Sequence, residues 1–248
     1  MADSEEELSK DTETILPNES YLNCERSFPS KRPICCRCKR PKKVCICCAF
    51  PEQRLDISTT IYVLQHPEER QRTLTTVPIV AACLPRDKCI VYNDVRYSRE
   101  KYAVLHHLLK QQQTFVLYPD ASAEDLREVA KQLDRDLRYN LVVPDGTWRQ
   151  ARKIFKKNEI LQNARKVRLN EDLKSDYVIR TQPTRKSLST LEAIATALSI
   201  LEGREEIANI LRKPLQLLCD IQLRHGAVPH SSKEEKHEEE LRKKAATK

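Results

Sequence analysis

Six cysteines lie within fourteen residues near the start of the sequence, and thiols clustered in this way indicate a metal site more often than disulfides. The spacing Cys35-x2-Cys38 is that of the first half of a structural zinc site, because the turn lets both thiolates reach one tetrahedral ion. The second pair, Cys45-x-Cys47, is tighter than usual. We predict one structural Zn²⁺ on Cys35, Cys38, Cys45 and Cys47. Cys36 and Cys48 compete for these roles, and redox-active thiols are the alternative.

A second group of chemically useful residues, Asp145-Gly146-Thr147-Trp148, follows a β-branched run. Asp145 stands where a strand gives way to a helix, so it either belongs to a pocket or simply caps the helix. Gly146 permits close approach of the backbone to a ligand. Trp148, the only tryptophan, can stack on a base or adenine or pack in the core.

Two further polar groups fall at predicted boundaries between elements. Gln65-His66-Pro67-Glu68-Glu69-Arg70 can present polar groups to a substrate, although residue types alone favour a helix start with acids near the positive end of the dipole. Ser189 and Thr190 open a helix whose free N–H groups suit an anion, and ordinary capping explains them equally well.

One stretch of the chain is strongly basic. Residues 149–168 contain eight lysines and arginines against Glu159, net +7. Five of them fall on one broad face at helical spacing: Arg149, Arg152, Lys153, Lys156 and Lys157. Because solvated faces rarely carry a single sign, this patch favours contact with nucleic acid, whose phosphates would make binding depend on salt.

The elements that must position these residues alternate along the chain. Runs rich in β-branched and aromatic residues predict strands at 57–64, 88–92, 114–118, 139–143 and 166–169. Helical patterns lie at 76–84, 100–112, 122–136 (capped by Ser122), 148–157, 189–201 and 205–223. This alternation predicts an α/β fold with a mainly parallel sheet covered on both faces, which binds ligands at the carboxyl ends of its strands.

Composition excludes several classes of protein. The chain has 248 residues and a net charge of +8, and no apolar run approaches the roughly 18–20 residues that span a bilayer. Residues 1–20 carry a net −6, unlike a signal peptide, so we expect the cytosol or nucleus. With only three isolated glycines, no glycine-rich nucleotide loop can form. We expect a disordered acidic leader (1–30), a zinc knuckle (31–51), one α/β domain (52–228) and a charged tail (229–248), disordered or a frayed helix.

Five strings in register resemble the DTW-domain proteins over roughly residues 32–225. They are Cys-x2-Cys…Cys-x-Cys, Gln65-His66-Pro67-Glu68…Arg70, Tyr118-Pro119, Asp145-x-Thr147-Trp148 and Ser189-Thr190-Leu191-Glu192-Ala193. That family includes tRNA-uridine aminocarboxypropyltransferases and is related to SPOUT-type methyltransferases. The resemblance therefore implies a SPOUT-like sheet with a carboxyl-terminal trefoil knot that holds S-adenosylmethionine.

The implied reaction moves the 3-amino-3-carboxypropyl group of S-adenosylmethionine to N3 of a tRNA uridine, with Asp145 as general base. The resemblance implies cofactor contacts from Gly146, Thr147, Trp148, Ser189, Thr190 and Glu192. We expect substrate contacts from Gln65, His66, Arg70, Arg149, Arg152, Lys153, Arg180 and Arg185, with Arg180 or Arg185 near the transferred carboxylate. We infer no obligate protein partner. The alternatives are a SPOUT-like RNA methyltransferase and a non-catalytic zinc-ribbon RNA-binding protein.

Overall fold

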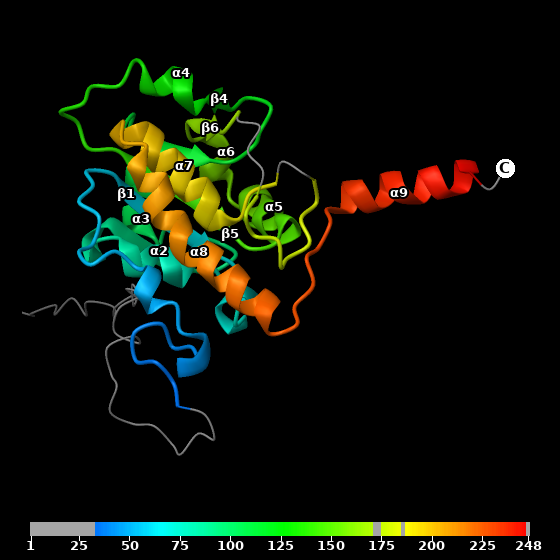
Figure 1. Ribbon diagram of the computed structural model, residues 1–248. Coiled ribbons are helices and arrows are strands. Elements are labelled where there is room, and N and C mark those ends of the chain that lie inside the picture. Colours follow the sequence, from blue (N-terminus) through cyan, green and yellow to red (C-terminus); the bar gives the residue numbers. More distant parts are fainter. Residues whose placement is uncertain (1–32, 171–174, 185–186, 247–248) are drawn as a thin grey trace, which may run out of the picture.

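The computed structural model describes residues 33–170, 175–184 and 187–246. The predicted acidic leader at 1–30 and the predicted substrate residue Arg185 lie outside these ranges. Figure 1 shows a central sheet flanked by helices, with the cysteine-rich segment at one end and a terminal helix that projects from the body.

The sheet has six strands, all paired in parallel, in the order β2-β1-β5-β3-β6-β4. Their bounds are β1 Thr60–Gln65, β2 Cys89–Asn93, β3 Thr114–Leu117, β4 Glu124–Asp125, β5 Asn140–Asp145 and β6 Lys166–Arg168. The predicted parallel α/β fold is therefore confirmed. The short β4 at the sheet edge was missed, because two polar residues carry no strand pattern.

The central strands are apolar on both sides because helices cover both faces. Along β5, Leu141 and Val143 belong to one buried cluster while Val142 belongs to the other, as expected when successive side chains point to opposite faces. The first cluster packs against α2 Val77–Cys83, α4 Leu126–Ala130, α7 Thr190–Glu202 and α8 Glu206–Arg224. The second packs against α3 Ala103–Leu108, α5 Trp148–Lys157 and α6 Glu159–Asn163.

The predicted helix at 122–136 is wrong in its start and its length. Asp120 accepts the hydroxyl of Ser122, and the carboxylate of Asp125 caps α4 by accepting Arg127 N–H at 2.8 Å. The helix at 100–112 is likewise shorter, as α3 covers only Ala103–Leu108. In the first case the helical pattern was overextended into turn residues, where the side chains of Asp120 and Asp125 bond to backbone N–H groups instead.

The cysteine-rich segment contains two short 3-10 helices, η1 Lys42–Val44 and η2 Cys47–Ala49. It docks on the main core through the buried side chains of Ile46 and Phe50, which join the first cluster. Two more 3-10 helices, η3 Pro67–Gln71 and η4 Arg86–Lys88, lie in connections between strands and helices. In the described part of the chain, no helix is both long and apolar enough to cross a membrane.

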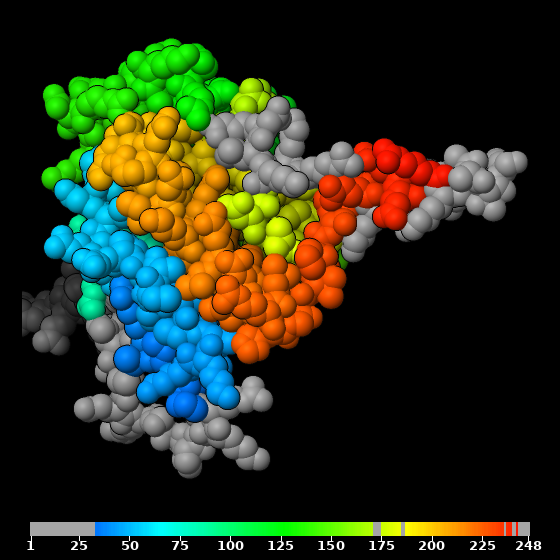
Figure 2. Space-filling model, viewed as in Figure 1, coloured from blue at the N-terminus to red at the C-terminus, as the bar shows by residue number. Residues whose placement is uncertain are grey.

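The carboxyl-terminal stretch, predicted as a disordered tail or frayed helix, is a helix over α9 Lys233–Ala246. It extends away from the domain (Figures 1 and 2). The segment that leads into it is tied to the loop before α7, because backbone N–H groups of His230 and Lys233 donate to Val178 and Gln182 at 2.8 and 2.9 Å. This strap brings the start of α9 to the site described next.

Candidate active site

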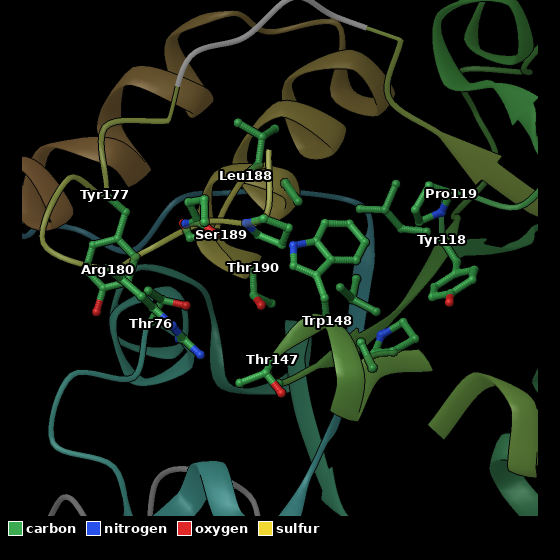
Figure 3. A pocket seen from close by; sticks show the side chains of 18 of the residues that line it. Thr76, Tyr118, Pro119, Thr147, Trp148, Tyr177, Arg180, Leu188, Ser189 and Thr190 are labelled. Atoms are coloured by element: carbon green, nitrogen blue, oxygen red, sulfur yellow. The ribbon is translucent and has the colours of Figure 1, made fainter. Parts of the chain in front are cut away.

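A cavity of about 400 Å³ opens at the carboxyl ends of β3, β5 and β6, where parallel sheets bind ligands. This volume lies in the range of small-molecule sites. Figure 3 shows Trp148 on one side of the hollow, Tyr177 and Arg180 on the other, Ser189 and Thr190 between them, and Thr147 below Thr190. The described residues that line it include apolar side chains, hydroxyls and four cations, and no aspartate or glutamate: Arg149, Arg168, Arg180 and Lys233 are the cations. The cavity therefore suits a ligand with a flat ring and an anionic group.

The turn from β5 into α5 needs a glycine at 146. Gly146 has φ +153°, a conformation that residues with a side chain rarely adopt. A Cβ there would also lie 2.9 Å from Cβ of Gln150. Gln150 belongs to the cap of α5: its Oε1 accepts Thr147 N–H at 2.7 Å, and its own N–H donates to the Thr147 hydroxyl at 3.3 Å. The turn thus holds Thr147 and the half-exposed Trp148 at the cavity wall.

Asp145 is buried at the end of β5 and is not among the residues that line the cavity. The parallel register places Gln65 between Asn93 and Asp145 at three neighbouring strand ends. Gln65 Nε2 donates to Asp145 Oδ2 at 2.9 Å, and Asn93 Nδ2 donates to Gln65 Oε1 at 3.2 Å. Thr190, which does line the cavity, also hydrogen-bonds the carboxylate of Asp145. The hydroxyl of Thr190 therefore connects the carboxylate of Asp145 with the cavity lining.

Burial raises the pKa of Asp145, and the hydrogen bonds from Thr190 and Gln65 oppose this rise without cancelling it. A buried carboxyl with a raised pKa beside a cavity is a recognised sign of a functional group. The catalytic role of Asp145 stays a prediction.

The start of α7 builds the part of the cavity wall between the Trp148 side and the Arg180 side. Ser189 caps this helix by accepting Glu192 N–H at 3.3 Å, while Glu192 Oε2 accepts Ser189 N–H at 2.7 Å. Glu192 is fully buried, and its carboxylate also accepts the Ser175 hydroxyl at 2.8 Å and Asp176 N–H at 2.6 Å. It does not line the cavity, so in this structure it orders the two segments around the cavity.

The remaining predicted substrate residues separate into three places. His66 is buried; its Nδ1 accepts Glu68 N–H at 3.4 Å. Arg70 is exposed on η3, away from the cavity lining. Arg152 and Lys153 lie with Arg149 on the exposed face of α5, while Ala151, Ile154 and Phe155 face the interior. The predicted basic helix face is therefore present, and it begins at the cavity mouth.

Sequence reasoning missed several residues at the site, and two of them, Glu69 and Lys233, are charged residues from unexpected places. Glu69 was assigned to a helix start, yet it is 2% exposed, and its Oε1 lies 2.9 Å from Arg72 Nη1 and 3.6 Å from Arg180 Nη2. Burial raises the pKa of Glu69, and the nearby Asp145 adds to this rise, while Arg180 and Arg72 oppose it without cancelling it. Lys233 was assigned to the tail. Neither carried a usable signal, because each reaches the site through contacts distant in sequence.

The four predicted cysteine ligands come together, with the Sγ atoms of Cys35, Cys38, Cys45 and Cys47 all within 4.8 Å of one another. The Cys35–Cys47 and Cys38–Cys45 Sγ separations are both 3.6 Å. Four thiolates at zinc–sulfur distances of about 2.3 Å in a tetrahedron would be about 3.8 Å apart, so the cluster fits such an ion. Cys36 and Cys48 are exposed and lie outside it.

The cluster already favours deprotonation at one position. Burial alone would raise the pKa of Cys35, but backbone hydrogen bonds from Cys38 and Arg37 and neighbouring sulfurs outweigh it and bring the pKa to about 6. Burial and the neighbouring sulfurs raise the pKa of Cys47. Crowded sulfurs that compete for protons in this way are suited to sharing a metal ion.

The fold and site define a class of α/β protein with two sites. One is a four-cysteine cluster able to hold a metal ion, and the other is a small-molecule cavity at the strand ends that is lined by cations. Residues 32–223 match the DTW domain, and the chain belongs to that family. It is 45% identical over 205 residues to tRNA-uridine aminocarboxypropyltransferase 2 of Macaca fascicularis, covering 82% of this chain and 68% of the relative. The protein of that name from Drosophila melanogaster is 42% identical over 207 residues, covering 83% and 81%. No solved structure matches.

Proposed function

We propose that this protein transfers the 3-amino-3-carboxypropyl group of S-adenosylmethionine to N3 of a uridine in tRNA. The observation that carries this proposal is the 42–45% identity, over most of both chains, to relatives named tRNA-uridine aminocarboxypropyltransferase 2. The geometry supports it, because a cavity with a partly exposed tryptophan and four cations suits a donor that combines an adenine ring with a carboxylate.

S-adenosylmethionine supplies a carbon bonded to a sulfonium, which is a good leaving group. When N3 of uridine bonds to that carbon, the carbon–sulfur bond breaks, its electron pair stays on sulfur, and methylthioadenosine leaves. The N3 proton has to be removed as the bond forms. In this proposal the hydroxyl of Thr190 passes that proton to Asp145, which it already hydrogen-bonds.

Other residues of the chain bind the tRNA and stabilise the fold. Trp148 offers a ring face to a base, and the exposed cations Arg149, Arg152 and Lys153 follow it along α5. Exposed cations on one helix face can contact phosphates, so tRNA would be bound largely through its backbone and shape. A zinc ion on the four cysteines would be structural, since the cluster lies in a separate knuckle and is absent from the cavity lining.

The SPOUT-like architecture with a carboxyl-terminal trefoil knot belongs to this proposal as well. It is supported by the family membership and by a parallel sheet that carries its site at the strand ends. We propose the cytosol or nucleus as the compartment, where thiols stay reduced and available to a metal.

The test is a label swap with purified protein and unmodified tRNA. One reaction contains S-adenosylmethionine labelled in the carboxyl carbon, and the other contains the donor labelled in the methyl group. Transfer of the carboxyl label alone is the expected result. Transfer of the methyl label would indicate an RNA methyltransferase instead. Transfer of neither label, with tRNA still bound, would indicate a binding module.

A further inference from the structure

We propose that Glu69 is a positioning residue that holds the guanidinium of Arg180 at the cavity, so that Arg180 selects a donor bearing a free carboxylate. This inference rests on the proposed function and names the group that recognises the part of the donor that is transferred. From the sequence alone, Glu69 was placed only at a helix start.

Glu69 is a buried acid on η3 whose carboxylate contacts two arginines. Its carboxylate is 2% exposed, with Oε1 at 2.9 Å from Arg72 Nη1 and at 3.6 Å from Arg180 Nη2. Among the described residues, Oε1 has no hydrogen-bond partner of good geometry, so the two arginines compensate the charge at this oxygen, while the backbone N–H of Thr147 also favours the ionised carboxylate. Burying an ionised carboxylate costs desolvation free energy, which has to be offset by attraction to its charged partners. Its position therefore depends on keeping both arginines beside it.

Arg180 connects this buried acid with the cavity. Its side chain is 31% exposed and lines the cavity, and the loop that carries it is held by backbone bonds such as Arg180 N–H to the Tyr177 carbonyl at 3.3 Å. Figure 3 shows Arg180 beside Tyr177 and Thr76, on the side of the hollow opposite Trp148. A guanidinium carries five N–H donors in a planar fork, so contact with Glu69 through one nitrogen leaves donors for a second anion.

Among the described residues that line the cavity, none is an acid that would compete for those donors. No aspartate or glutamate is among the described lining residues, whereas Arg149, Arg168 and Lys233 add positive charge. A carboxylate can bind the arginine fork through two parallel hydrogen bonds, which fixes its orientation as well as its position. Because the donor's carboxylate lies close to the carbon that is attacked, fixing it also orients the reacting carbon.

The test compares binding of three small molecules to the full chain by calorimetry, without tRNA. S-adenosylmethionine carries the carboxylate, decarboxylated S-adenosylmethionine lacks only that group, and methylthioadenosine lacks the whole transferred chain. We expect the wild type to bind S-adenosylmethionine at least about tenfold more tightly than the decarboxylated form. Glu69→Gln and Arg180→Gln should each reduce this ratio toward one while leaving methylthioadenosine affinity within about twofold.

Glu128→Gln is the matched control, because Glu128 forms an exposed ion pair with Lys131 on α4. It should leave all three affinities unchanged. A thermal melt of each variant checks folding, and Glu69→Asp, which keeps the charge, should recover part of the ratio if Glu69→Gln is unstable. The inference is overturned if the wild type does not discriminate, or if Arg180→Gln abolishes discrimination while Glu69→Gln preserves it. These results do not depend on the label swap, so the two proposals can fail separately.

Discussion

Replacing Asp145 with asparagine should separate activity from stability. The substitution keeps the shape of the side chain and removes its charge. Asparagine can keep its oxygen toward Gln65 Nε2, now at 2.9 Å from Oδ2, and turn its amide toward the Thr190 hydroxyl, which can rotate to accept. At most one hydrogen bond is weakened, a cost of about 1 kcal/mol, and a buried charge is lost, which offsets it.

The pH dependence of the unfolding free energy shows whether Asp145→Asn stabilises or destabilises the protein. Because burial raises the pKa of Asp145 above its value in the unfolded chain, the stability it contributes is full at acid pH and is lost as the pH rises through the folded-state pKa. Asparagine does not titrate, so Asp145→Asn should be at least as stable as the wild type near neutral pH. Denaturant unfolding at several pH values measures this directly.

The same substitution, Asp145→Asn, should lower catalytic activity although it preserves stability. A positioned general base contributes roughly 100-fold to 10,000-fold, or about 3–5 kcal/mol of barrier, so kcat of Asp145→Asn should fall by that factor. Wild-type kcat should also fall at acid pH, as Asp145 takes up a proton. Single-turnover transfer to tRNA measures both, with Asp220→Asn as an exposed control on α8. A folded Asp145→Asn with kcat within about threefold of the wild type would refute the base assignment.

Three further predictions concern the Thr190 hydroxyl, the cysteine cluster and the carboxylate of Glu202, which binds the residues just before β1. Thr190→Val should lower kcat by about the same factor as Asp145→Asn, while Thr190→Ser keeps it; equal losses in both variants in single-turnover assays would contradict a hydroxyl relay. Cys38→Ser should release bound metal and lower the melting temperature, as metal analysis and a thermal melt will show, whereas a metal-free wild type would contradict the knuckle assignment. Although burial raises the pKa of Glu202, hydrogen bonds from Thr59 and Ser58 outweigh it and lower the pKa. The stability that Glu202 contributes is thus present above the ordinary glutamate pKa and lost as the pH falls through the folded-state value, and Glu202→Gln should remove about 1–2 kcal/mol at neutral pH in denaturant unfolding, with no loss expected at low pH.

Features that depend on neighbours in sequence were predictable. The cysteine spacing indicated four ligands that do converge, and the spacing of cations after Trp148 placed them on the exposed face of α5. The β-branched runs located five of the six strands of the sheet. In each case local geometry is enough, because a turn or a helical period determines which side chains share a face.

Contacts across the fold could not be predicted in the same way. A strand pattern indicates which faces are buried but not which strands pair, and only the insertion of β5 between β1 and β3 brings Gln65 to Asp145. The same packing buries Asp145 behind the cavity lining and places its carboxylate beside Thr190, which does line the cavity. Glu69 and Arg180 meet although they are far apart in sequence. The sequence by itself thus determined the kinds of residues available to the site, while tertiary packing decided which of them face one another, since that depends on the order of strands and not on local periodicity.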